Sequence, residues 1–183
     1  MDLDDITNKN LKAALKASAI LDIEFCDDEH LRCFSYKAEY ARGVDIATYD
    51  NGGGDQIVIV LTSNTILIKG FDHESQVSPH SQDEYAIWPG MYQGTPKELL
   101  KILEADDFEI DHVTFCFWRS EKDAAWQQGP VNFKNNEDDG ASWLLCAIPK
   151  TPSDFIEYAN EYYSDDFNKV SPERVYQVFN ENT

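Results

Sequence analysis

Two runs of β-branched and aliphatic residues, separated by three polar residues, constrain the fold more than any other part of the chain. Residues 56–61 and 65–69 are rich in Ile, Val and Thr, and Thr62, Ser63 and Asn64 lie between them. A short polar break between two such runs predicts a β-hairpin. The glycine-rich residues 50–55 lack lysine and do not lead into a helix. They therefore indicate a connection between strands rather than a phosphate-binding loop.

Four further segments are typical of strands. Residues 31–36 and 44–49 are short strand-like pieces, and residues 111–118 place Val113, Phe115 and Phe117 at alternate positions. Residues 142–148 form another apolar run of strand length. No regular alternation of strand and long helix runs through the middle of the chain, so the pattern favours antiparallel pairing.

Helices are predicted towards both ends of the sequence. Residues 8–21 carry Leu11, Ala14, Leu15 and Ala19 at helical spacing, with Thr7 or Asn8 as a cap. Later in the chain, three pairs place Ser or Thr before Pro, as at a helix start: Thr95-Pro96, Thr151-Pro152 and Ser171-Pro172.

Glu98 is expected to complete a capping box with Thr95. After Thr151-Pro152, apolar residues recur at helical spacing from Phe155 to Tyr162, which indicates a face that packs on the core. We therefore predict a single α+β domain spanning residues 1–183. Its central sheet is largely antiparallel, and N-terminal and C-terminal helices pack against it.

Charge limits the partners of this chain. The 183 residues include 34 Asp and Glu but only 15 Lys and Arg, a formal net charge of −19. Nucleic acids and anionic membranes are bound through basic surfaces, so we expect neither as a partner. Aromatic residues make up 13% of the chain, which favours a packed core over an acidic disordered tail. A charged partner is expected to be basic.

The lack of a recognisable targeting signal and the spacing of the cysteines predict a cytoplasmic protein. The first ten residues are acidic and polar, and no apolar run approaches the roughly 18 residues that cross a bilayer. Cys26, Cys33, Cys116 and Cys146 form no CxxC pair. Two disulfides are compatible with the even count, but reduced and buried thiols are the favoured interpretation.

Residues 70–94 show little periodicity and are rich in aromatic, acidic and histidine side chains. A loop of this length in a compact domain usually has a function or packs over a face. We take it as the candidate partner-binding patch, with these residues as contacts: Asp72, His73, Glu74, Asp83, Glu84, Trp88 and Tyr92. A metal site on His73 and His80 is the alternative. Structural hydrogen bonding by these groups is favoured over metal binding.

Catalytic motifs are not found, so we expect no catalytic residue and no cofactor, and a non-enzymatic role is favoured. No nucleophile elbow or HExxH pattern occurs. Cys26 lies near His30, but the carboxylates between them are expected to raise the pKa of the thiol. A hairpin after residue 118 is expected to bring Trp118 and Trp126 together, with Arg119 pairing with a carboxylate or stacking on a Trp.

Several of these segments together resemble a family of uncharacterised bacterial cytoplasmic proteins. The residues that carry the resemblance span about 55–180: the string GFDHES at residues 70–75, Trp88-Pro89-Gly90, Trp118-Arg119, Trp126, Trp143 and Tyr162-Tyr163. The family has no established activity. It looks like the small acidic immunity proteins that accompany toxins, which implies a binding role.

Three hypotheses follow from the sequence. The first is an acidic protein-binding module, an immunity-type inhibitor that neutralises a basic toxin such as a nuclease. The second is a metal-dependent hydrolase that uses Asp72, His73, Glu74 and His80. The third is a non-enzymatic scaffold or a subunit of an oligomer.

Overall fold

A single six-stranded antiparallel sheet forms the centre of the molecule. The computed structural model describes residues 8–104, 108–133, 137–163 and 171–183. The strands lie in the sheet in chain order, and each pairs with its neighbours in the antiparallel sense. They are β1 (Phe34–Ala41), β2 (Val44–Asp50), β3 (Gln56–Thr62), β4 (Thr65–Phe71), β5 (Phe115–Ser120) and β6 (Gln127–Gln128).

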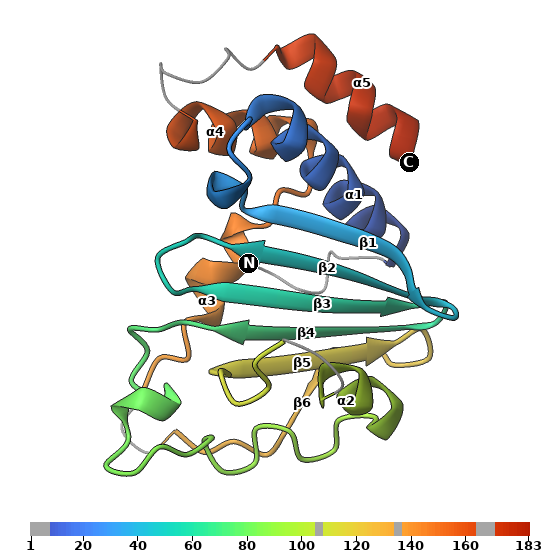
Figure 1. Ribbon diagram of the computed structural model, residues 1–183. Coiled ribbons are helices and arrows are strands. Elements are labelled where there is room, and N and C mark those ends of the chain that lie inside the picture. The colour runs from blue at the N-terminus through green and yellow to red at the C-terminus, as the bar shows by residue number, and fades with distance from the viewer. Residues whose placement is uncertain (1–7, 105–107, 134–136, 164–170) are drawn as a thin grey trace.

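Helices precede and follow the sheet, and two short ones are inserted in the long connection from β4 to β5. They are α1 (Asn8–Phe25), η2 (Glu29–Leu31), η3 (Pro79–Ser81), α2 (Lys97–Glu104), α3 (Ala141–Leu144), η4 (Leu145–Ala147), α4 (Pro152–Tyr162) and α5 (Pro172–Asn182). Figure 1 shows α1, α4 and α5 grouped beside β1, with α2 beside β5. The predicted α+β class and antiparallel sheet are therefore confirmed. Among the helices of the described ranges, none is both long enough and apolar enough to span a bilayer.

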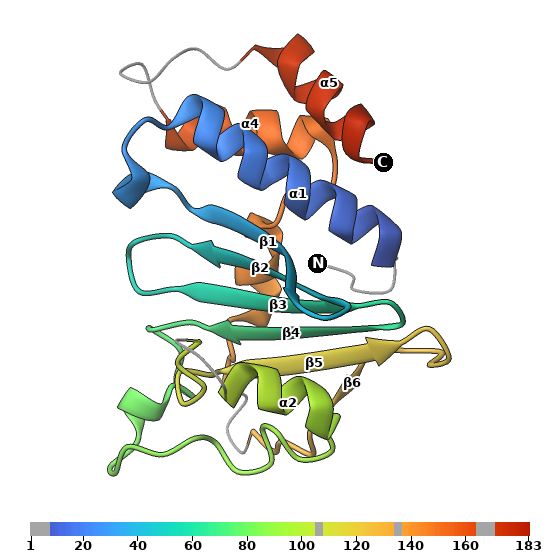
Figure 2. The ribbon, with the colours of Figure 1, turned by 45° about the vertical axis from the view of Figure 1, so that its right-hand side comes forward.

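Side chains alternate between the two faces of the sheet, and each face has its own apolar core. On one face, Ile57, Ile59 and Ile68 pack with the buried sides of α1, α3, α4 and α5. On the other face, Val60 and Leu67 pack with α2 and with the connection between β4 and β5. Figure 2 shows α2 in front of the sheet, while α3 crosses behind the strands. The period of two along β3 and β4 produces this division.

A buried carboxylate joins α1 to β1 and α4. Asp22 has no exposed surface, accepts a hydrogen bond from the backbone N–H of Phe34 and accepts another from the hydroxyl of Tyr163. Burial raises the pKa of Asp22, while these hydrogen bonds act in the opposite direction. Since Phe34 lies on the outer strand, Asp22 also occupies a backbone donor that would otherwise be free at the edge of the sheet.

The predicted hairpin is confirmed as β3 and β4, and the glycine-rich residues 50–55 connect β2 to β3. Three other boundaries differ. Residues 142–148 form α3 and η4 rather than a strand, because Leu144, Leu145 and Ile148 reach the core at helical spacing. β1 begins at Phe34, since η2 occupies residues 29–31, and β5 begins at Phe115, after a turn in which His112 N–H donates to Glu109 C=O.

Two of the three predicted cap positions are confirmed. Thr151 forms a capping box with Asp154, and Ser171 accepts a hydrogen bond from the N–H of Arg174. The remaining helix, α2, begins at Lys97, because the carbonyl of Pro96 accepts the first helical hydrogen bond, from the N–H of Leu100. Thr95 and Glu98 therefore do not form the expected capping box. The proposed cap at Thr7 lies outside the described residues.

Candidate functional site

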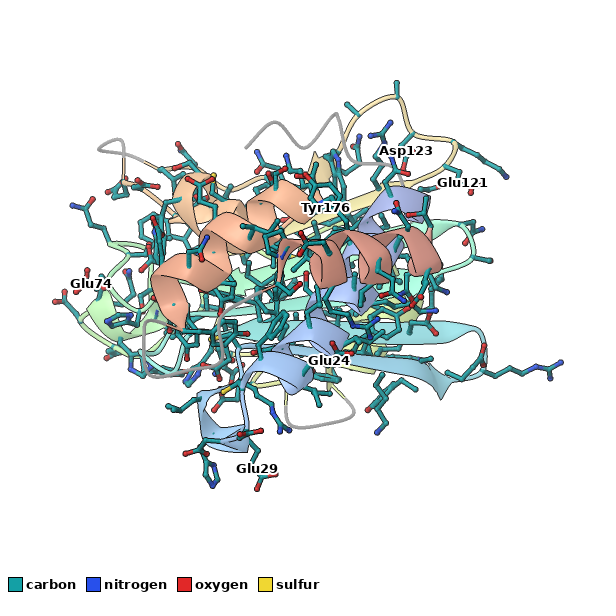
Figure 3. All side chains as sticks on the ribbon, turned by 90° about the horizontal axis from the view of Figure 1, so that it is seen from above. Glu24, Glu29, Glu74, Glu121, Asp123 and Tyr176 are labelled. Carbon is teal, nitrogen blue, oxygen red and sulfur yellow. The ribbon has the colours of Figure 1, made fainter. Side chains whose placement is uncertain are left out.

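The predicted patch lies at the end of the molecule where β4 ends and the β2–β3 turn begins. Figure 3 shows Glu74 pointing outward at this end, with Glu121 and Asp123 at the opposite one. The loops that meet here carry exposed carboxylates, and we call this surface the acidic end: Glu74, Asp83, Glu84, Glu109, Asp111 and Asp138. Three of the four histidines of the chain, His73, His80 and His112, belong to the same loops.

His73 is held by a buried carboxylate from the β2–β3 turn. Its Nδ1 lies 2.8 Å from Oδ1 of Asp55, which also accepts the backbone N–H of His73 at 3.1 Å. This hydrogen bond raises the pKa of the His73 imidazole. Burial alone would raise the pKa of Asp55, but hydrogen bonds from His73 and Asn51 bring it below its ordinary value. The pair therefore fixes the turn to the end of β4.

Asp72 is buried rather than available to a partner. Its Oδ1 accepts the N–H of Glu74 at 2.9 Å, and its Oδ2 accepts Nε1 of Trp143 at 2.9 Å. Gly140 approaches it so closely that a Cβ there would lie 2.2 Å from Oδ2, and its φ of +78° also favours glycine. Asp72 thus links the end of β4 to the start of α3.

Asp55, Asp72 and His73 are also the described residues that come nearest to a three-ligand metal cluster. Their ligand atoms lie within 4.8 Å of one another. Two ligands of a tetrahedral metal, each about 2.05 Å from it, would be about 3.3 Å apart. The 2.8 Å between His73 and Asp55 is the length of a direct hydrogen bond. The geometry therefore favours a structural network at these three residues.

Trp88 and Tyr92 are partly buried against the second core. Both pack against the apolar cluster on the α2 side of the sheet. The Tyr92 hydroxyl donates to the carbonyl of Ile110 at 2.7 Å, and the Trp88 ring lies against Phe133. The patch members with exposed side chains are therefore His73, Glu74, Asp83 and Glu84.

Tyr85 is an exposed aromatic that was not among the predicted contacts. It is 52% exposed and follows Asp83 and Glu84 directly in the chain. Partial burial raises its pKa, and the charges of Asp111 and Glu109 act in the same direction, so these carboxylates lie near enough to influence the ring. The sequence places four Phe, Tyr and Trp residues in this loop but carries no signal for which of them would remain at the surface.

His80 lies beside His112 rather than beside the ligands expected from the sequence. The two Nε2 atoms are 3.4 Å apart. The His112 ring stacks on Phe71 at 4.9 Å between centroids, and the His80 ring meets Tyr85 edge-on at 5.0 Å. Because the two histidines are 32 positions apart in the chain, local spacing did not reveal the pair.

A buried lysine shapes the loop that carries His112. Lys69 is 1% exposed, and its Nζ donates to the carbonyls of Phe108 and Glu109 at 2.6 and 2.9 Å. Burial lowers the pKa of Lys69 to about 8, although nearby acidic groups oppose this change. Glu109 adopts a φ of +43°, and its side chain accepts Nδ1 of His112 at 3.2 Å. Lys69, on β4, therefore positions the Glu109–His112 pair through the backbone of this loop.

Trp118 and Trp126 do not form the expected pair. Trp118 is opposite Gln127 in the sheet and belongs to the core on the α2 side. Trp126 packs against the core on the other face. The strands pair as predicted, but the register places the two indoles on opposite faces. No ion pair of Arg119 occurs among the described residues.

A hollow in the described surface lies elsewhere, between α1 and β1. It has a volume of about 580 Å³. Ile20 and Ile23 are exposed at its rim, and Lys16, Arg32, Glu29 and Asp50 give it charges of both signs. Unlike the acidic end, this groove carries no excess of one charge.

The cysteines are free thiols, as the sequence favoured, although Cys146 is exposed rather than buried. Burial raises the pKa of the Cys26 and Cys33 thiols, and that of Cys116 to about 12. The negative charge of Asp22 also raises the pKa of Cys26. These three groups are therefore poor nucleophiles near neutral pH.

No protein-family model, no curated protein and no solved structure matches this chain. The resemblance to immunity-type proteins stays a prediction.

Proposed function

We propose that this protein is a binding module that engages a basic protein partner through its acidic end. The observation that carries the proposal is Tyr85, a half-exposed aromatic ring within a surface of exposed carboxylates. Interface anchors are commonly aromatic side chains, and surrounding charges determine orientation and the rate of encounter. Glu74, Asp83 and Glu84 would pair with Lys and Arg of the partner.

A basic toxin in the cytoplasm, such as a nuclease, is the partner class that this surface fits best. Enzymes that act on nucleic acid present basic surfaces to it. A chain with a net charge of −19 can cover such a surface and be drawn to it over long distances at low salt. The sequence resemblance to immunity-type proteins supports the same role.

The two alternatives have less support. In the hydrolase hypothesis, Asp72 and His73 would act on a substrate, but both Asp72 oxygens accept internal hydrogen bonds and His73 Nδ1 pairs with Asp55. The scaffold hypothesis draws on the apolar rim of the groove between α1 and β1. That rim gives no indication of a particular partner.

The test uses purified basic nucleases of the bacterial toxin type and measures inhibition of their cleavage of DNA or RNA. We expect inhibition by the wild-type protein that weakens as NaCl rises from 50 to 300 mM. The triple variant E74Q/D83N/E84Q should lose at least about tenfold in inhibitory potency, because it removes three negative charges from the acidic end. Tyr85→Ala should lose a similar factor.

The matched control is E98Q/E121Q/E181Q, which changes the net charge equally but at exposed residues on α2, after β5 and on α5, outside the acidic end. It should inhibit as the wild type does. Equal loss in both triple variants would show that only net charge matters and would contradict the assignment to this surface. Failure to inhibit any nuclease of the panel would contradict the toxin class.

A further inference from the structure

We infer that His80 and His112 form a binding site for a divalent transition metal of the zinc class. The site would stand whether or not a basic partner binds the acidic end. It differs from the pair expected from the sequence, since His73 is held by Asp55 and takes no part.

The separation of the two imidazole nitrogens is the first support. The Nε2 atoms lie 3.4 Å apart. Two histidines on a tetrahedral zinc, each with Zn–N of about 2.05 Å, place their nitrogens about 3.3 Å apart. The observed separation is therefore the one that two imidazole ligands of a single metal ion require. The 2.8 Å of the His73–Asp55 pair does not meet this condition.

Glu109 is the second support. Its carboxylate lies 3.2 Å from Nδ1 of His112. A histidine that binds a metal commonly donates its other ring N–H to a carboxylate, which fixes the tautomer and leaves the second nitrogen free to coordinate. With Nδ1–H donated to Glu109, His112 Nε2 keeps a lone pair for coordination, 3.4 Å from Nε2 of His80. Glu109 is thus a positioning residue for the site.

Packing holds both rings in place. His112 stacks on Phe71 at the end of β4, with 20° between the ring planes. His80 lies against Phe71 on one side and Tyr85 on the other. Lys69 on β4 donates a hydrogen bond to the backbone carbonyl of Glu109. His80, His112 and Glu109 are therefore all held against the sheet. Such support lowers the entropy lost when a ligand orders its site.

The donor set indicates which metals would bind. Imidazole nitrogens suit Zn²⁺, Ni²⁺ and Cu²⁺, whereas Mg²⁺ and Ca²⁺ prefer oxygen ligands. Two histidines leave coordination positions for water or for an exposed carboxylate of the acidic end. We expect moderate affinity, since structural zinc sites use four protein ligands.

The experiment titrates the full chain with Zn²⁺ by calorimetry and follows histidine ring nitrogens by NMR. We expect one Zn²⁺ per chain, with shifts at His80 and His112 and none at His30. His80→Gln and His112→Gln should each weaken Zn²⁺ binding at least about tenfold. His30→Gln, at an exposed histidine on η2, is the matched control and should bind as the wild type does.

Glu109→Gln should weaken binding while both ring nitrogens still shift, because it changes the partner of His112 and not the ligands. Circular dichroism verifies that each variant is folded. Unchanged affinity in both single histidine variants would overturn the site. So would equal competition by Mg²⁺, which would indicate carboxylate ligands, or an absence of Zn²⁺ binding at millimolar concentration.

Discussion

The buried carboxylate of Asp55 changes the pKa of the exposed His73 imidazole. Asp55 is 4% exposed, while the His73 side chain remains 44% exposed. The pKa of the imidazole is raised by its hydrogen bond to Asp55. That of Asp55 is lowered: burial opposes the change, but the hydrogen bonds from His73 and Asn51 prevail. Both shifts favour the charged pair in the folded state.

The pair predicts a pH-dependent contribution to stability. The raised pKa of His73 gives a contribution that is complete below the unfolded value of about 6.5 and is lost as pH rises through the folded value. The lowered pKa of Asp55 gives one present above about 3.9 and lost as pH falls through its folded value. The free energy of unfolding lost in His73→Gln should therefore be greatest near pH 5 and smaller at pH 8.5.

Urea denaturation of wild type and His73→Gln across this range measures the difference. His30→Gln serves as the control, because His30 is exposed and its ring has no carboxylate within ion-pair distance among the described residues. A loss in His73→Gln that stays constant from pH 5 to 8.5 would contradict the charged pair.

For single residues, the sequence predicted a property more often than the contact that produces it. The carboxylates next to Cys26 were expected to raise the pKa of its thiol, and the direction is confirmed. The main cause is burial, and the leading charge is Asp22, one helical turn earlier. The burial of Asp72 and Tyr92 depends on Trp143 and Ile110, which are distant in sequence, so local composition did not reveal it.

At the scale of elements, β4 and β5 pack together through a glycine. Gly70 lies on β4 opposite Phe115 on β5, and a Cβ at Gly70 would lie 1.9 Å from the end of the Phe115 ring. Gly70 is not among the residues with positive φ. The requirement for glycine is therefore one of space alone.

Gly70→Ala should lower the free energy of unfolding by about 1–3 kcal/mol, the usual range for overpacking. Phe115→Leu removes the end of the ring, so the double variant should be more stable than the sum of the two losses predicts, by about 0.5 kcal/mol or more. Chemical denaturation of the four proteins measures this coupling.

Gly43→Ala is the matched control. Gly43 has a φ of +72° with nothing within 4 Å of an added Cβ, so its cost is backbone strain. Combined with Phe115→Leu, its loss should be additive. Coupling of the same size at both glycines would show that contact with the ring is not the cause.

Elements defined by adjacent residues were predicted well, and those that depend on distant contacts were not. The β3–β4 hairpin and the starts of α4 and α5 follow from turn and cap residues in the chain itself. Residues 142–148 have the composition of a strand. They form α3 and η4 because they fill space behind the sheet, and only the tertiary structure defines that space.

On the scale of the whole molecule, the charge of −19 opposes the compact state through self-repulsion. Few ion pairs offset it in the described ranges, mainly Lys12–Asp45 and Arg174–Glu24. Added salt should therefore stabilise the protein, since the Debye length falls from about 30 Å at 0.01 M to about 10 Å at 0.1 M.

We expect the urea midpoint to rise between 10 and 200 mM NaCl. The same rise in choline chloride would identify screening as the cause, because choline does not share the specific binding of a small cation. A midpoint that is constant or falls would show that self-repulsion is not a major cost.

The overall class was predictable because strand signals fill the middle of the chain and helix signals its ends. The candidate site was predictable only in its location. The acidic loop was identified from its composition, but the His80–His112 pair and the exposure of Tyr85 depend on how residues 70–94 and 108–114 meet.

The packing of α1 against α4 and α5 has a consequence for synthesis in the cell. The apolar side of α1 and the buried Asp22 are completed by helices that begin more than a hundred residues later. At roughly 5–20 residues per second, the ribosome takes on the order of ten seconds or more to make the intervening chain. The strands of the sheet can pair in chain order during that interval, while the apolar side of α1 still lacks its contacts with α4 and α5. Chaperones that hold apolar segments would therefore find their target in the first helix, until α5 has emerged.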